Sequence, residues 1–144
     1  MKYDYFIASR WRNKETVVDF AGKIKAKGKT VYCFVDSDGA EYKLQEWERN
    51  YSPEQFMEKF ESIPNWKNSP HVKEIFDVGM NALKESSALI LLLPAGKSAH
   101  LEAGVAFGMG KKCILVGEQK ETESLYLIFE EAYPSIEDFI KTLA

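Results

Sequence analysis

The residues best suited to chemistry in this sequence are a hydroxyl, an imidazole and a carboxylate that stand close together: Ser98, His100 and Glu102. A glutamate can act as a nucleophile or as a general acid or base, depending on whether its carboxyl group is ionised. We expect Glu102 in the first turn of a helix, where backbone N–H groups and the helix dipole favour its charged form. A glutamate at such a position also compensates the dipole without doing any chemistry, so the residue types alone leave both roles open.

The chain around these residues predicts a β-loop-α-β unit. Residues 88–93 form a continuous apolar run, which is typical of a strand buried on both faces of a parallel sheet. A short loop containing Gly96 follows, then a helix rich in alanine and glycine over 99–110, and a second apolar strand over 113–116. The loop therefore lies at the carboxyl end of its strand, which is the edge of an open α/β sheet where ligands bind.

The segment LLPAGKSAHLEAGVAFGMGKKCILV resembles the nucleoside 2-deoxyribosyltransferase-like superfamily, which includes the deoxynucleoside 5′-monophosphate N-glycosidases. The resemblance is carried by the pattern LP-x-G-[RK]-SAHLE-x-G-x-A-x-G-x-GK, and the order of strands and helices extends it more weakly along the chain. In that superfamily the glutamate of the motif attacks C1′ of a nucleoside sugar, which implies this role for Glu102. The resemblance also implies that Ser98 lies near a sugar or phosphate oxygen, and we add Gly96 and His100 to the expected substrate-binding residues.

Departure of the base from a nucleoside needs a proton, so a second acid is expected. The resemblance implies an aspartate on the helix before the buried strand, and Asp77 is the candidate on a helix predicted to begin at Pro70. An exposed surface aspartate is the alternative. A further aspartate, usual in the superfamily just before the buried strand, is replaced here by Ser87. His100 is expected to diverge from Glu102 around the helix, and it either donates the proton or packs at a contact between two copies of the chain.

A basic loop follows the first predicted strand, residues 3–8, and contains Ser9, Arg10 and Arg12. If that strand is central, the loop lies at the same edge of the sheet as Ser98. Arginines beside a helix N-terminus suit an anion such as a phosphate. The alternative is a solvated basic loop that binds no anion. The resemblance, in which this loop lines the nucleotide pocket, favours the first reading. We therefore predict that nucleoside monophosphates are preferred to nucleosides.

Apolar strands that alternate with helices predict an α/β fold, a doubly wound (flavodoxin-like or Rossmann-like) parallel sheet in the order 2-1-3-4-5. The segment 40–69 is longer than the usual connection between elements and interleaves aromatic with charged residues, so we expect a lid or a partner surface there. The five predicted strands comprise residues 3–8, 30–35, 88–93, 113–116 and 124–129.

Cap and turn residues predict where several helices begin and end. Gly28 is expected just after the end of the first helix, in a left-handed conformation. Ser52 and Gln55 are spaced for a capping box at the start of another helix, and Ser135 is expected to cap the last one. Residues 36–39 form a turn by composition.

The bulk properties narrow the class of protein. A length of 144 residues with 45% hydrophobic composition predicts one domain over 1–144. A net charge of −3 with mixed signs argues against binding a nucleic-acid polymer, and no apolar run reaches transmembrane length.

The start of the chain lacks a signal-peptide pattern, and Cys33 and Cys113 stand in apolar runs that favour buried, reduced thiols, so we expect a cytoplasmic protein. We expect no metal and no cofactor. A homodimer is also expected, formed partly through the helix 99–110 or the aromatic segment 40–69.

The leading functional hypothesis is an N-glycosidase or 2-deoxyribosyltransferase that acts on a nucleoside or a nucleoside 5′-monophosphate. Glu102 would form a glycosyl-enzyme, which water or a second base would then resolve. Two alternatives stay open. One is a nucleotide-binding sensor with little catalysis, which Ser87 favours because an expected acid is missing. The other is an NAD-cleaving enzyme similar to the TIR-type glycohydrolases, which also rely on a glutamate carried by a helix.

Overall fold

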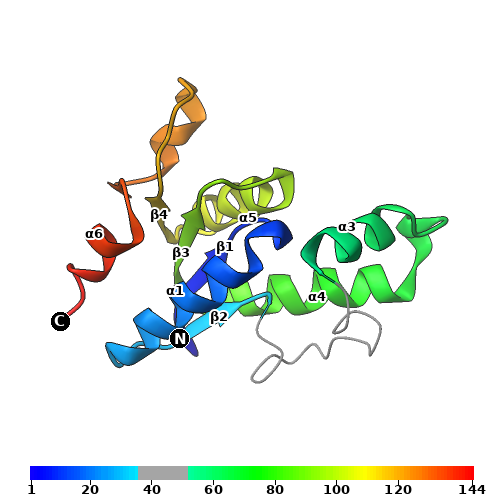
Figure 1. Ribbon diagram of the computed structural model, residues 1–144, viewed down its shortest axis with the longest axis horizontal. Helices are drawn as coiled ribbons and strands as arrows, with labels where there is room; N and C mark the ends of the chain where they lie inside the picture. The colour runs from blue at the N-terminus through cyan, green and yellow to red at the C-terminus, as the bar shows by residue number, and fades with distance from the viewer. Residues whose placement is uncertain (36–51) are drawn as a thin grey trace.

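A computed structural model describes residues 1–35 and 52–144 of the chain. The turn predicted at 36–39, and the segment 40–69 as far as residue 51, lie outside the described residues. The described chain forms an α/β fold on a five-stranded parallel sheet (Figure 1). Its strands are β1 (Tyr3–Ala8), β2 (Val31–Cys33), β3 (Ser86–Leu92), β4 (Lys112–Val116) and β5 (Glu131–Tyr133).

The strands lie in the order β2-β1-β3-β4-β5, all parallel, which confirms the predicted fold class and strand order. The described helices are α1 (Lys14–Ala26), α3 (Pro53–Glu61), α4 (Pro70–Lys84), α5 (Lys97–Gly108) and α6 (Ile136–Ile140), with the short 3₁₀ helices η1 (Trp11–Asn13), η2 (Trp66–Asn68) and η3 (Ser124–Ile128). Helices α1 and α6 pack on one face of the sheet, and α4 and α5 pack on the other. The sheet is therefore covered on both sides, as a doubly wound fold requires.

The central strand β3 sends alternate side chains into two hydrophobic cores. Leu89 and Leu91 pack beneath α4 and α5, whereas Ile90 and Leu92 pack beneath α1 and α6. These four side chains are at most 2% exposed, and burying each of them stabilises the fold by about 1.5–3 kcal/mol. The prediction that this run is a strand buried on both faces is confirmed.

The prediction of a fifth strand over residues 124–129 is wrong. These residues form η3, and β5 follows them to complete the sheet. The carboxylate of Glu123 accepts a hydrogen bond from the backbone N–H of Leu125, which caps the start of the 3₁₀ helix. A 3₁₀ helix places residues three apart on one side, so Tyr126 and Phe129 stack there with ring centroids 5.9 Å apart. The half-buried and exposed apolar residues that result alternate as they would in a strand.

The predicted cap residues are confirmed. Gly28 follows α1 with a φ of +78°, the left-handed conformation that favours glycine. The hydroxyl of Ser52 accepts from the N–H of Gln55 (3.2 Å), and the Gln55 side chain accepts from the N–H of Ser52 (2.9 Å), a complete capping box. The hydroxyl of Ser135 accepts from the N–H of Asp138 (3.2 Å). These local contacts begin or end helices where the sequence predicted.

Candidate active site

The loops after β1 and β3 lie side by side at the carboxyl edge of the sheet, as predicted for neighbouring parallel strands. The side-chain amide of Asn13 donates hydrogen bonds to the carbonyl oxygen of Pro94 (2.5 Å) and to the hydroxyl of Ser9 (3.1 Å). The buried Ser9 hydroxyl in turn donates to the carbonyl oxygen of Leu92 (2.9 Å). These bonds tie the two loops together, so the geometry gives Ser9 a structural role rather than an open contact for substrate.

Glu102 lies in the second turn of α5, so the prediction that it lies in the first turn is wrong. The helix begins at Lys97 instead of at residue 99, because the extended backbone of Gly96 ends the loop and the next residue is already helical. The first turn of α5 therefore contains no acidic residue. Since the stabilisation of an anion by a helix dipole falls off within one turn, Glu102 receives little of it.

The carboxyl group of Glu102 makes no hydrogen bond or ion pair within residues 1–35 and 52–144. Part of the side chain remains accessible to solvent, but protein atoms surround most of it. This burial disfavours the charged form and raises the pKa of Glu102 from 4.5 to about 7. The sequence predicted that the charged form would be favoured, and the structure shows the opposite. At neutral pH the group is divided between a carboxylate, which can attack as a nucleophile, and a carboxylic acid, which can donate a proton.

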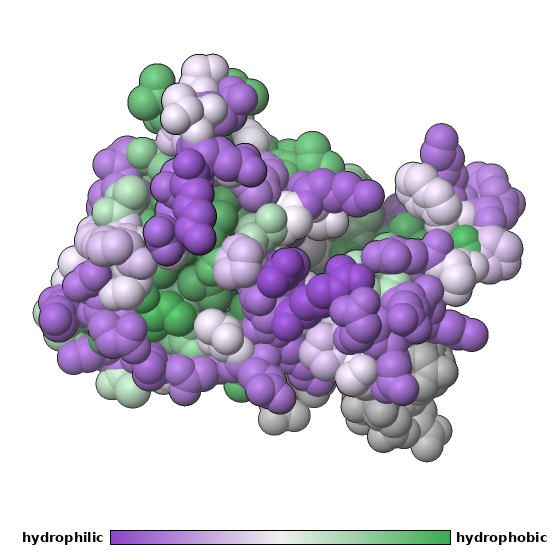
Figure 2. Space-filling model, turned by 45° about the horizontal axis from the view of Figure 1, so that its top comes forward, coloured by the Kyte–Doolittle hydropathy of each residue, from purple (hydrophilic) through white to green (hydrophobic). Residues whose placement is uncertain are grey.

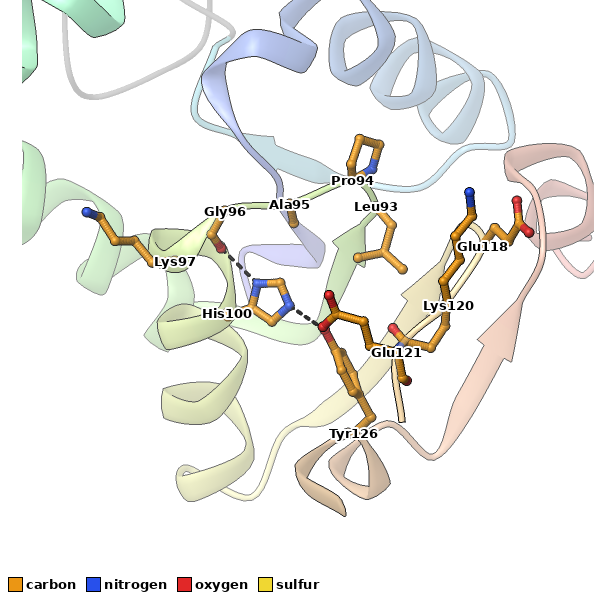
Figure 3. Close-up of a pocket in the computed structure, with 11 residues that line it drawn as sticks. Leu93, Pro94, Ala95, Gly96, Lys97, His100, Glu118, Lys120, Glu121 and Tyr126 are labelled. Carbon is orange, nitrogen blue, oxygen red and sulfur yellow. Dashed lines mark hydrogen bonds between the residues drawn. The ribbon is translucent and has the colours of Figure 1, made fainter. Parts of the chain in front are cut away.

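His100 lies on the opposite flank of α5 from Glu102, because two residues of an α-helix are about 200° apart around its axis. Its Nδ1 lies 2.8 Å from the carbonyl oxygen of Gly96, and its Nε2 lies 2.8 Å from the hydroxyl of Tyr126 in η3 (Figure 3). A carbonyl oxygen can only accept, so Nδ1 carries a hydrogen, and Nε2 of the neutral ring accepts from the tyrosine hydroxyl. Both ring nitrogens are used within the protein. His100 therefore positions the start of α5, and the predicted divergence from Glu102 is confirmed.

Arg12 is engaged by two acidic residues of α3. Its Nε and Nη2 atoms lie 2.5 Å and 3.0 Å from the two carboxylate oxygens of Glu54, and Glu61 lies 3.9 Å away. The hydrogen bond from Arg12 lowers the pKa of Glu54. Next to this pair, the ring of Trp11 stacks on Phe56 with centroids 4.0 Å apart. The Nε and Nη2 donors of Arg12, which a phosphate would use, are thus already bound to Glu54. The same contacts hold α3 against the loop after β1.

Arg10 is the more accessible arginine of the same loop. Its side chain is exposed, and its Nε donates to the side-chain oxygen of Asn13 (3.3 Å). Its Cβ lies 4.0 Å from the point where a Cβ on Gly96 would lie, so Arg10 stands beside the start of α5. Ser98, in the first turn of α5, is also exposed. Of the residues predicted to hold an anion, Arg10, Gly96 and Ser98 are thus brought together in the structure.

Asp77 is not joined to Glu102 by any described contact. Its carboxylate pairs with Lys73 one turn earlier on α4, at 2.6 Å. Ser87, which stands where the superfamily usually has an aspartate, is the second residue of β3, at the amino end of the strand. An acid at that position would lie at the opposite edge of the sheet from the loops described above, so its absence does not affect them.

A cavity of about 700 Å³ lies on the flank of α5 that carries His100, between the loop after β3 and the loop after β4 (Figure 3). Glu102 does not line it. Of the residues that line it, the sequence had singled out Gly96 and His100 but not Glu121 or Tyr126, and Tyr126 had been assigned to a strand. The signal that could have found them is the acidic cap Glu123, which begins a helix rather than a strand.

No protein-family model matches the chain, and no curated protein matches it significantly. Within residues 1–35 and 52–144, no three His, Cys, Asp or Glu side chains gather as a possible metal site, and no helix could cross a membrane. Cys33 and Cys113 are both buried and form no disulfide within the described residues, as predicted. Burial raises the pKa of Cys113 to about 11, so this group stays an unreactive thiol.

Proposed function

We propose that this protein cleaves or transfers the N-glycosidic bond of a nucleoside or nucleoside 5′-monophosphate, with Glu102 as the nucleophile. The observation that carries the proposal is the Glu102 carboxyl group, which is mostly surrounded by protein atoms, has no partner among the described residues and has a pKa raised to about 7. A buried carboxyl group without a partner costs stability, and such groups concentrate at functional sites. The resemblance of residues 92–116 to the deoxyribosyltransferase-like superfamily supplies the reaction class.

The reaction develops positive charge on the sugar. A carboxylate oxygen of Glu102 attacks C1′, the bond from C1′ to the base nitrogen breaks, and the base leaves with the electron pair and takes up a proton. Because the carboxylate stands in surroundings that do not stabilise its charge, its attraction to the oxocarbenium-like sugar is greater in the transition state than in the ground state. Water or a second base then attacks C1′ and releases Glu102. Asp77 stays our candidate for the proton donor, although it would have to exchange its pairing with Lys73.

For the 5′-phosphate, we propose Arg10 rather than Arg12 as the contact. Arg10 is exposed beside Gly96 and Ser98, whereas Arg12 is held by Glu54. A guanidinium group and the backbone N–H groups at the start of α5 suit a phosphate. We therefore expect the preference for nucleoside monophosphates to depend on Arg10.

A nucleotide-binding sensor is the second candidate function. It is favoured by the fact that Ser9, Arg12, Asp77 and His100 all use their polar atoms within the protein. Only Glu102, among the residues predicted for catalysis, is left without a described partner. A sensor of this kind would bind a nucleotide and release no base.

The outward face of α5 supports the proposal of a homodimer. Leu101 is 70% exposed there, and Val105, one turn later, is exposed as well. Leu125 and Leu127 add apolar surface on the projecting segment that carries η3, whose end shows green atoms on either side of white and purple ones in Figure 2. Apolar side chains gathered in this way on a surface are typical of a contact between proteins. Light scattering should give twice the mass of the chain at micromolar concentration, and a monomer would contradict the proposal.

A substrate panel tests the function directly. The purified protein is incubated with nucleosides, their 5′-monophosphates and NAD, and free base is measured by chromatography. Since the nucleophile must be ionised, kcat/KM should rise with pH and level off above pH 7, with a change of about tenfold between pH 6 and pH 8. A fall over this range would assign Glu102 the role of a general acid. Binding without any release of base would favour the sensor.

A further inference from the structure

The cavity beside His100 has the size of a small-molecule site. Its volume of about 700 Å³ lies inside the range of roughly 300–1,000 Å³ that is usual for ligand pockets. It is formed by the loop after β3, the first turns of α5 and the loop after β4. Glu102 faces the other flank of α5 and does not line it. A molecule in this cavity is therefore not the one whose bond Glu102 would break.

The walls of the cavity are fixed by contacts within the protein. Tyr126 and Gly96 are linked through the two ring nitrogens of His100, both at 2.8 Å. The N–H of Leu93 donates to the last residue of β4 at 2.8 Å. Gly117, which follows β4, has a φ of +119°, and a Cβ there would lie 2.9 Å from the Cβ of Leu93. The site is thus largely preformed, which lowers the cost of ordering it around a ligand.

The side chains around the middle of the cavity define its chemistry. Figure 3 shows Leu93 and the ring of Tyr126 on two sides, and the side chain of Glu121 extends toward the space between them from the loop after β4. Lys97 points away from this group, to the other side of the helix start. Glu121 and Glu118 form no ion pair within the described parts of the chain. The lining therefore combines apolar surface from Leu93 and Tyr126 with exposed charged side chains, the carboxylates of Glu118 and Glu121 and the ammonium group of Lys120.

We propose that this cavity is a second binding site, which takes a planar heterocycle whose edge carries an exocyclic amino group. Leu93 and Tyr126 contact the faces of the ring, and Glu121 accepts hydrogen bonds from its edge. This inference rests on the lining of the cavity and not on the proposed reaction at Glu102.

Calorimetry with adenine and hypoxanthine tests the proposal, because these purines differ in that one carries an amino group where the other carries an oxo group. Adenine should bind the wild-type protein at least about tenfold more tightly than hypoxanthine, since a hydrogen bond to a charged group contributes about tenfold or more. Glu121→Gln should weaken adenine binding by a similar factor. Glu15→Gln, an exposed glutamate on α1 across the sheet, is the matched control and should leave binding unchanged.

Glu102→Gln separates this site from the proposed active site. Adenine should bind this variant as tightly as it binds the wild-type protein, whether or not the wild-type protein releases base from any nucleotide. The proposal is overturned if adenine does not bind at millimolar concentration, or if it binds Glu121→Gln as tightly as wild type. It is equally overturned if Glu102→Gln, but not Glu121→Gln, abolishes binding, because the ligand would then lie on the other flank of α5.

Discussion

The two flanks of α5 show how differently one helix can treat two polar side chains. His100 and Glu102 are two residues apart, and both are only partly exposed. His100 has a partner for each ring nitrogen, and these bonds hold the start of the helix. Glu102 has no described partner, and its burial raises its pKa to about 7. A satisfied polar group stabilises a fold, whereas an unsatisfied one costs free energy, so the flank of Glu102 is where we expect chemistry.

The strongest test of this comparison is Glu102→Gln. The amide keeps the shape of the side chain but cannot form a glycosyl-enzyme, so base release should fall by about a hundredfold or more, in kcat rather than in binding. Chromatography of free base measures the loss, circular dichroism checks the fold, and Glu15→Gln serves as control. If the variant keeps more than about a tenth of wild-type turnover, the activation free energy has risen by less than roughly 1.4 kcal/mol, which would argue against a nucleophile at this position.

The same substitution should make the protein more stable at high pH. The pKa of Glu102 is about 7 in the folded protein against a usual 4.5, so the folded state holds the proton more tightly than the unfolded state. The wild-type free energy of unfolding therefore falls as pH rises from 4.5 through 7, and Glu102→Gln removes this loss. We expect a gain of up to about 3 kcal/mol at pH 8 that nearly vanishes at pH 4. Urea unfolding at both pH values measures it, and an unchanged stability at pH 8 would show that the carboxylate is solvated or paired.

The two arginines of the loop after β1 offer a smaller, sharper contrast. Arg10→Ala should remove most of the preference for a nucleoside 5′-monophosphate over the nucleoside, a change of about tenfold in the ratio of their kcat/KM values. Arg12→Ala should leave that ratio nearly unchanged, because Arg12 is bound to Glu54. The reverse result would mean that the phosphate displaces Glu54 and that Arg12 is the anion contact.

The smallest effect is expected on the flank of His100. Tyr126→Phe removes the hydroxyl that His100 contacts but keeps the ring, so turnover should change by less than about threefold, while the start of α5 loosens. Proton NMR of the imidazole should report the lost hydrogen bond. A loss of turnover as large as that of Glu102→Gln would show that both flanks belong to one site.

Much of the fold could be predicted because its signals are local. The apolar run that became β3, the glycine at 28 and the capping box at Ser52 each depend on a few neighbouring residues. The one predicted strand that failed, residues 124–129, has a pattern that a strand and a surface 3₁₀ helix share. Its true structure depends on the packing of Tyr126 against the core and against His100, which are distant in the chain.

By itself, the sequence determined the α/β class, the strand order and the loops that meet at the carboxyl edge, because chain connectivity and apolar patterning leave few alternatives. It also singled out Glu102, through its motif. Only the tertiary structure decided which polar groups have partners. Arg12 pairs with Glu54, Asp77 pairs with Lys73, and His100 contacts Tyr126. Even the pKa of Glu102 shifted in the direction opposite to the one its helix position predicted. The physical reason is that desolvation and pairing depend on which atoms surround a group in space, and most of those atoms come from other parts of the chain.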